Sequence, residues 1–336
     1  MMKILVMGVT GFIGSRAARQ LVGDGHEVYG FLRSNGGAKL EGLAGTVRGD
    51  LLDPRSVEEA INTVKPEGVL FAAGERYPSG RVGKSYLELM QKSRVEGSRN
   101  TLEAIVKLGL DTCFVSVSGA LAYKRHEAYK GEIRASLSRE IDEIDGSTWF
   151  GDTLLKWEGV IQSYVNKGVN ASILRLGAVY GWGGVWRERF FEPMLHHSRT
   201  FVPGNGRISV SFVHVDDVAR AISYIYKRCS PGEVYNVVDD EPVELRVFLE
   251  EAAKTFGAPL PLYVPLILAR IRFGAAYRLI APSFTLSQAV SNEKIKKLGF
   301  EFRYPTYREG LQQVKKEAEK EVGADREIQE KQAVQA

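Results

Sequence analysis

Three glycines near the amino terminus constrain the fold of this chain more than any other feature. Gly8, Gly11 and Gly14 follow a short aliphatic run at 3–7 and open a segment, 12–22, whose apolar residues are spaced four apart. Glycine permits a tight turn and lets the backbone approach a diphosphate, and a helix amino terminus offers N–H groups and positive potential. The pattern predicts a strand, a turn and a helix that bind the phosphates of a nucleotide; the alternative is a purely structural turn.

Strand and helix signals alternate over the first half of the chain. The predicted strands lie at 3–7, 27–32, near Val47, 69–72, 113–117 and 171–176, with helices at 12–22, after Asp53-Pro54, and at 86–108 and 149–166. This order predicts an α/β class fold, a Rossmann-like doubly wound parallel sheet with ligands at the carboxyl ends of its strands. We assign 1–180, with returns from 210–240, to a dinucleotide-binding domain, 181–209 and 241–312 to a smaller C-terminal substrate-covering region, and 313–336 to a charged helix or tail.

The composition narrows the class of protein. Hydrophobic residues make up 44% of the 336 residues, which predicts an ordinary packed core. The net charge of +4 is too small to suggest a nucleic-acid binder. The two cysteines, Cys113 and Cys229, are expected to form neither a disulfide scaffold nor a metal site, which favours a reducing, cytoplasmic location. The five histidines form no metal-ligand pattern, so no metal is expected.

Two segments bear on membrane association. The apolar run at 3–7 reaches a glycine too soon, and without a cleavage signal, to be a signal peptide, and we expect it to be the first strand. Residues 259–282 are rich in Leu, Ile, Ala and Tyr, but Pro265 and three arginines interrupt them, so no membrane span is expected. We expect a buried or lid helix there; the alternative is an interfacial amphipathic helix.

The glycine spacing, G-x-x-G-x-x-G, and further motifs resemble one protein family. The other matching segments are Gly49-Asp50-Leu51-Leu52-Asp53, Ala72-Ala73-Gly74, Val95-Glu96-Gly97-Ser98-Arg99-Asn100, Leu174-Arg175-Leu176-Gly177-Ala178-Val179-Tyr180-Gly181, Phe212-Val213-His214-Val215-Asp216-Asp217-Val218-Ala219, Gly232-Glu233-Val234-Tyr235-Asn236-Val237 and Leu298-Gly299-Phe300. Over about residues 3–312 the chain resembles the extended (atypical) short-chain dehydrogenase/reductase superfamily, in its NAD-dependent epimerase/dehydratase family. The resemblance implies a Rossmann fold and an NAD(P) cofactor.

The resemblance also implies which residues contact the cofactor. They are Gly8, Thr10, Gly11, Phe12, Ile13, Gly14, Arg33, Asp50, Leu51, Ala72, Ala73, Gly74, Leu176 and Val179. Asp50 is expected to accept a hydrogen bond from the adenine amine while Leu51 flanks the ring; the alternative for Asp50 is a solvated turn carboxylate. A guanidinium suits a 2′-phosphate, so Arg33 at the end of the second strand favours NADP over NAD unless it is simply an exposed arginine.

The chain departs from the family at the catalytic positions. The family uses a tyrosine four residues before a lysine, on one helix face, for acid–base chemistry, and the aligned positions here hold Phe150 and Leu154. Ser118 ends the fifth strand where the family has its serine, and it is the one catalytic residue we assign; its alternative role is a turn cap. Lys156 lies about 200° around the helix from the lysine position, so we do not expect it to substitute.

The substrate side departs as well. Arg94 stands where the family has a helical asparagine, and Val210 where sugar-nucleotide relatives have an arginine that grips a diphosphate. Tyr123 matches a tyrosine that borders the substrate pocket in relatives, and Arg207 is a second candidate for substrate contact, although its offset differs from theirs.

Two functions remain open from the sequence. The first is an NAD(P)-dependent epimerase, dehydratase or reductase that acts on a sugar nucleotide or another small hydroxy or carbonyl compound without the usual Tyr-Lys pair. The second is a catalytically inactive NAD(P)-binding module that serves as a sensor, an assembly factor or an RNA-associated protein. By resemblance, a homodimer through the helices at 86–108 and 149–166 is also expected.

Overall fold

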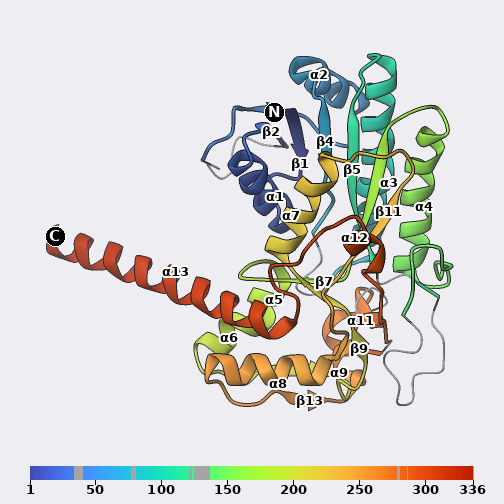
Figure 1. Cartoon of the computed structure of the whole chain (residues 1–336). Coiled ribbons are helices and arrows are strands. Elements are labelled where there is room, and N and C mark those ends of the chain that lie inside the picture. The colour runs from blue at the N-terminus through green and yellow to red at the C-terminus, as the bar shows by residue number, and fades with distance from the viewer. Residues whose placement is uncertain are drawn as a thin grey trace.

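The computed structural model describes residues 1–33, 41–76, 81–120, 123–124, 137–277, 281–285 and 287–335 (Figure 1). Its centre is a parallel sheet with the strand order β11-β6-β5-β4-β1-β2-β3. The strands are β1 (Lys3–Met7), β2 (Glu27–Leu32), β3 (Gly45–Arg48), β4 (Gly68–Phe71), β5 (Cys113–Gly119), β6 (Ala171–Leu176) and β11 (Val234–Val237). The predicted Rossmann-like α/β class is confirmed.

The order of these strands places the ligand-binding crevice. β1 pairs with β2 on one side and with β4 on the other, so the chain reverses its direction of travel across the sheet beside β1. In doubly wound sheets ligands bind at such a point, beyond the carboxyl ends of the strands. The glycine turn after β1 and the Ala72-Ala73-Gly74 segment after β4 both lie at this edge.

Helices cover both faces of the sheet. Side chains of α1 (Phe12–Gly23) and α7 (Val215–Tyr226) pack on one face, and those of α2 (Pro54–Val64), α3 (Lys84–Lys107) and α4 (Trp149–Val165) pack on the other. β4 is buried along its whole length between these layers, which explains why the sequence shows it as a continuous apolar run. β6 is buried as well, although it carries Ser172 and Arg175.

Local capping fixes where several helices begin. The Asp53 side chain accepts from the amide of Arg55 and Pro54 follows it, so α2 begins as its sequence predicts. At α4, the Thr148 hydroxyl accepts from the amide of Gly151, 2.9 Å away. The cap of α7 is His214, whose ring nitrogen accepts from the amide of Asp216.

A smaller layer lies below the sheet and holds a core of its own. Its strands form three pairs: β7 (Ala178–Tyr180) with β10 (Phe212–His214), β9 (Ser209–Val210) with β12 (Val243–Glu244), and β8 (Phe201–Pro203) with β13 (Leu262–Val264). Its helices are α5 (Gly184–Trp186), the π-helix η2 (Arg187–Phe191), α6 (Glu192–Leu195), α8 (Leu245–Phe256), α9 (Leu266–Phe273) and α11 (Pro282–Thr285). α12 (Glu293–Lys297) packs instead on the central sheet beside β11, where Ile295 is buried. The rings of Phe212 and Phe248 stack at its centre, with centroids 3.9 Å apart.

The chain ends in one long helix, α13 (Tyr307–Gln335), which extends away from the body (Figure 1). Its first part is anchored, because Leu311, Val314 and Ala318 are fully buried in the lower core. Glu321 accepts from the indole of Trp182 at 2.7 Å and pairs with Arg187 at 2.6 Å. The predicted charged segment at 313–336 is therefore the continuation of a helix that begins at Tyr307.

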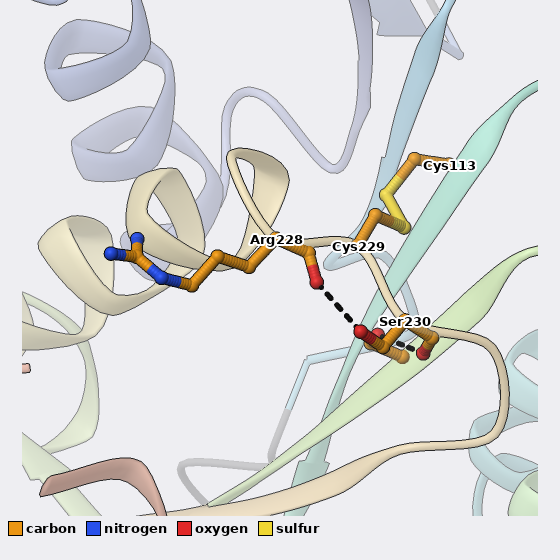
Figure 2. Close-up of a disulfide and its surroundings, with 5 residues drawn as sticks. Cys113, Arg228, Cys229 and Ser230 are labelled. Atoms are coloured by element: carbon orange, nitrogen blue, oxygen red, sulfur yellow. Dashed lines mark hydrogen bonds between the residues drawn. A yellow bond between two sulfur atoms is a disulfide. The ribbon is translucent and has the colours of Figure 1, made fainter. Parts of the chain in front are cut away.

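The expectation for the cysteines is wrong. Cys113, at the start of β5, and Cys229, after α7, form a disulfide, with Cα atoms 6.1 Å apart (Figure 2). The two residues are 116 positions apart in the sequence and meet because α7 runs back along the sheet to the amino-terminal end of β5. Counting cysteines cannot reveal such a contact. Because Cys113 and Cys229 are bonded to each other, they do not indicate a reducing compartment.

Within 259–282, the described residues include β13 and α9, and Ala269 is the buried residue of α9. The expectation of a buried helix is therefore wrong, and the role of a lid stays a prediction. Among the described residues, no helix combines the length and the apolar character needed to cross a bilayer. Within the same part of the chain, no cluster of three or more His, Cys, Asp or Glu side chains is arranged to hold a metal ion.

Candidate functional site

The turn after β1 consists of glycines because other backbone atoms occupy the space of a side chain. A Cβ built at Gly14 would lie 2.1 Å from the carbonyl oxygen of Gly8, and one built at Gly8 would lie 2.5 Å from that of Ala72. Gly8 also has a φ of 90°, a conformation that favours glycine. The amide of Gly11 donates to the carbonyl oxygen of Gly8 at 2.8 Å and closes the turn. The loop therefore presents backbone atoms alone at Gly8, Gly11 and Gly14.

The amino terminus of α1 carries the chemistry that a diphosphate requires. Gly11 is its cap residue, no side chain caps it, and no acidic residue lies in its first turn. The amides of Phe12, Ile13 and Gly14 therefore lack helical partners, and the helix dipole adds positive potential there. The ring of Phe12 packs against Gly183, where a built Cβ would lie 2.6 Å from the ring, so this residue offers its backbone to the site. Thr10 is exposed beside them.

The segment expected at the adenine is held by its own hydrogen bonds. The Asp50 carboxylate accepts from the amide of Leu52 at 2.9 Å, and the backbone of Asp50 bonds to the hydroxyl of Ser56. The side-chain amide of Asn100 donates to the carbonyl oxygen of Leu51 at 2.7 Å. One oxygen of Asp50 thus serves the turn, which fixes the direction of the carboxylate.

Arg33, at the end of β2, has an acidic partner that the sequence reading did not identify. Its guanidinium donates to the Glu75 carboxylate at 2.6 Å, and this hydrogen bond and charge raise the pKa of Arg33. The Arg33 side chain is 71% exposed, whereas that of Glu75 is 18% exposed. The pair spans the crevice between the ends of β2 and β4.

The end of β4 is clamped from α3. Ala72 extends the strand ladder by donating its amide to Met7, and Ala73 lies against Gly8. The guanidinium of Arg94 donates to the carbonyl oxygens of Met90 and Glu75, at 2.7 and 3.0 Å, and lies over Gly74. The arginine that replaces the family asparagine therefore positions this loop.

Ser118 belongs to a buried charged network. Its hydroxyl donates to Glu158 of α4 at 2.6 Å, and Glu158 forms a bidentate ion pair with Arg175 of β6 whose shortest bond is 2.7 Å. Burial lowers the pKa of Arg175, but the hydrogen bonds and charge of Glu158 outweigh burial and raise it. Because the single hydroxyl proton of Ser118 is directed at Glu158, its oxygen faces other groups as an acceptor.

Tyr123 joins the same network from the next loop. Its hydroxyl accepts from Arg175 at 2.9 Å and donates to the side-chain oxygen of Asn236 at 2.5 Å. Burial raises the pKa of Tyr123 to about 12, even though the Arg175 charge opposes the shift. At neutral pH this phenol is fully protonated and its proton is already donated, so it is unsuited to act as a general base.

The structure surrounds the family tyrosine position with apolar groups. Phe150 lies against Gly119, where a built Cβ would come 2.8 Å from its ring, and Leu154 is fully buried beside it. Trp149, Phe150 and Phe273 pack around a small apolar cluster that contains Leu87 and Met90 of α3. Phe150, which we align with the family tyrosine, is therefore enclosed by apolar groups.

The remaining predicted residues lie in separate places. Leu176 ends β6 and is buried, and Val179 of β7 pairs with Val213. Arg207 is exposed in the turn before β9, where its amide donates to the Asn205 side chain at 3.0 Å. Ser118 and Tyr123 share one network, whereas Arg207 belongs to the lower layer.

Comparisons with known proteins assign the family. A model of the NAD dependent epimerase/dehydratase family matches residues 4–238. The chain belongs to this family. Among curated proteins it is similar to 3-diazoavenalumate denitrifying reductase of Streptomyces sp, 25% identical over 92% of this chain and 99% of that protein. It is also similar to 2-alkyl-3-oxoalkanoate reductase of Stenotrophomonas maltophilia, 24% identical over 83% of this chain and 81% of that protein.

Solved structures share the fold. UDP-glucose 4-epimerase of Thermotoga maritima superposes with a TM-score of 0.77 at 22% identity, covering 95% of this chain and 99% of that one. The human epimerase family protein SDR39U1, solved with NADPH, gives a TM-score of 0.75 at 19% identity, covering 93% and 99%. This chain thus has the fold of both solved structures, of which the human protein binds NADPH.

Sequence reasoning missed three charged residues beside the family site: Glu158, Arg175 and Glu75. Two of them leave a signal in the sequence. Arg175 interrupts an otherwise apolar strand, and a buried arginine requires a carboxylate partner. Glu158 lies on the buried stripe of α4, next to Trp157 and four residues after Leu154. The partnership of Glu75 with Arg33 has no such signal, because it depends on how two loops meet.

Proposed function

We propose that this protein is an NADP-dependent member of its family that transfers hydride to or from a small hydroxy or carbonyl compound. The glycine turn carries the proposal, since Gly8 and Gly14 leave bare backbone and uncapped amides where a dinucleotide diphosphate would lie. A bound nicotinamide supplies the hydride chemistry, and the protein supplies binding and orientation. The two curated relatives described above are named as reductases of carbonyl or diazo compounds, which agrees with this reaction class.

The side chains at the site suggest how a substrate is held. Ser118 donates its proton to Glu158, so its oxygen is set to accept a hydrogen bond from a substrate alcohol rather than to donate to a carbonyl. Phe150 and Leu154 occupy the family tyrosine and lysine positions and move no proton. We infer that the usual Tyr-Lys relay is absent, which for an unmodified mechanism costs about 10²- to 10⁴-fold in rate.

The same arrangement suggests which parts of the chain cover the substrate. We propose that the lower layer, built from 181–209 and 241–312, covers the substrate, and that Tyr123 contributes through its contact with Asn236 and Arg175. Arg207 remains a candidate substrate contact from the turn before β9. We further propose a homodimer through α3 and α4.

Cofactor binding tests the proposal directly. In a calorimetric titration, wild-type protein is expected to bind NADPH more tightly than NADH. Gly14→Ala should weaken NADPH binding at least about tenfold, because its methyl group collides with Gly8 and displaces α1 from the turn. Gly23→Ala, on the same helix with open space around it, is the matched control and should bind as wild type. No heat with either coenzyme contradicts the proposal.

A second function is favoured by one observation. The absence of a proton-transfer group at Phe150 and Leu154 suits a protein that retains the cofactor without turnover, as a sensor or assembly factor. Turnover of NADPH against a panel of ketones, 3-oxo acids and sugar nucleotides distinguishes the two. Tight NADPH binding without oxidation over the whole panel supports the inactive module, and oxidation of any panel member supports the enzyme.

A further inference from the structure

Six exposed apolar side chains belong to the lower layer, whose elements β13 and α9 lie at the end of the molecule opposite α2 (Figure 1). Between 44% and 67% of each is exposed. We call them the basal apolar surface; they are Phe201, Leu260, Leu262, Ile267, Leu268 and Ile271. They come from β8, from β13 and the residues before it, and from α9.

Backbone pairing places two of these residues on one face. Leu262 of β13 pairs directly with Phe201 of β8, and side chains paired across parallel strands point to the same face. The alternate residue Val202 is buried, which confirms that the Phe201 face is the outer one. α9 follows β13 directly after Pro265 and turns its buried residue, Ala269, toward the protein.

The charged side chains of the two segments that build this surface are all basic. The two segments that build it, 193–215 and 252–292, contain no Asp or Glu. Arg270 and Arg272 of α9 are exposed among its leucines and isoleucines. The nearby carboxylates belong to neighbouring helices: Glu250 pairs with Arg246 on α8, and Glu188 precedes Arg189 in η2.

We propose that the basal apolar surface docks this protein onto an anionic lipid bilayer as a peripheral protein. Apolar side chains beside arginines match the boundary between acyl chains and acidic headgroups. A second copy of the chain is a poorer occupant. A two-fold interface through this surface would bring Arg270 and Arg272 close to their own copies with no carboxylate from either segment between them. The flat bilayer supplies both the apolar layer and the negative charge.

The position of α9 connects this surface to the candidate site. α9 ends at Phe273, which packs against the cluster of Leu87 and Met90, and Phe150 packs against the same cluster. The guanidinium carbons of Arg189 and Arg272 lie 4.8 and 5.6 Å from the centroid of the Phe273 ring. A docked protein would thus hold its substrate-covering layer next to the membrane.

Vesicle flotation of the full chain tests the proposal. Wild-type protein is expected to float with phosphatidylglycerol vesicles and to remain below with phosphatidylcholine vesicles at 0.15 M salt. The double change Arg270→Gln and Arg272→Gln should lower the partition coefficient on anionic vesicles about 25-fold, at roughly fivefold for each charge. The double change Ile267→Ser and Ile271→Ser should lower it at least about tenfold.

Matched controls separate docking from misfolding and from self-association. Ile141→Ser and Leu298→Ser remove apolar groups of 89% and 36% exposure that belong neither to this surface nor to α3 and α4, and should float as wild type. The thermal unfolding midpoint of each variant confirms that it folds. Failure of wild-type protein to float with anionic vesicles overturns the proposal. Flotation of both double variants to the same extent as wild type overturns it as well. A fall in sedimenting mass of Ile267→Ser, Ile271→Ser without vesicles also overturns it, because the surface then pairs two copies. NADPH binding is measured separately, so failure here leaves the proposed function standing.

Discussion

Arg33 is the residue expected to discriminate between the two coenzymes. A guanidinium forms charge-assisted hydrogen bonds to a 2′-phosphate, which NADH lacks. Arg33→Ala should therefore weaken NADPH binding about tenfold or more and leave NADH binding unchanged. Because Glu75 holds the guanidinium at 2.6 Å and competes with the phosphate, Glu75→Gln should tighten NADPH binding. Arg19→Ala, an exposed arginine on α1, is the control. Equal losses for both coenzymes would show that Arg33 reads a shared part of the cofactor.

Tyr123 is expected to give the stability a pH dependence above pH 10. Burial raises its folded pKa to about 12, above the ordinary value of about 10, so the folded state holds the phenol proton more tightly than the unfolded chain. The stabilisation from the neutral phenol is complete below about pH 10 and is lost as the pH rises through about 12, by about 3 kcal/mol. Urea unfolding between pH 9 and 12 measures this loss as the difference in the free energy of unfolding between wild type and Tyr123→Phe. A difference that stays constant with pH would contradict the buried, neutral phenol.

Individual residues differ in how far the sequence predicts them. Gly8 and Gly14 are predictable because a side chain at either position collides with backbone, a constraint that any sequence with this turn must satisfy. Glu75 is not predictable in the same way, since its carboxylate meets Arg33 across 42 residues through the packing of two loops. Residues held by local geometry are therefore visible in a sequence, whereas residues held by long-range contacts are visible only in a structure.

Among the elements, the Cys113–Cys229 link joins the amino-terminal end of β5 to the connection between α7 and β11 (Figure 2). Next to it, the Ser172 hydroxyl of β6 donates to the backbone carbonyl of Ser230 at 2.9 Å. Closing a loop of this length limits the unfolded chain, so reduction should lower the free energy of unfolding by about 2–4 kcal/mol. Urea unfolding with and without dithiothreitol measures the change. The double variant Cys113→Ser, Cys229→Ser should be insensitive to dithiothreitol, and an insensitive wild type would contradict the link.

The sheet and the lower layer also differ in how far the sequence predicts their elements. Most strands of the sheet are apolar runs bounded by turns, and α2 carries its own Asp53 cap and Pro54, so the sequence places them correctly. β3 is short and not apolar, and the sequence indicates it only near Val47. β7, β9 and η2 have between two and five residues each, too few to show a periodicity. They form because aromatic rings such as Phe212 and Phe248 pack against one another, which depends on segments distant in sequence.

At the scale of the whole molecule, two exposed apolar regions point to different partners. One lies on α3 and α4, and the other is the basal apolar surface. Leu155 lies on the solvent face of α4 at 45% exposure, on the face of the sheet where α3 and α4 pack together. If that face pairs two copies, the sedimenting mass is about twice the 37.3 kDa of one chain.

Leu155→Glu should then dissociate the dimer, because a two-fold interface places the two new carboxylates near each other in a buried setting. Val247→Glu, a similarly exposed site on α8 at 42%, should leave the mass unchanged. Sedimentation velocity over a range of protein concentrations measures both. A wild-type chain that sediments as a monomer at every concentration would refute the helical interface, and a loss of dimer in Val247→Glu alone would move the interface to the lower layer.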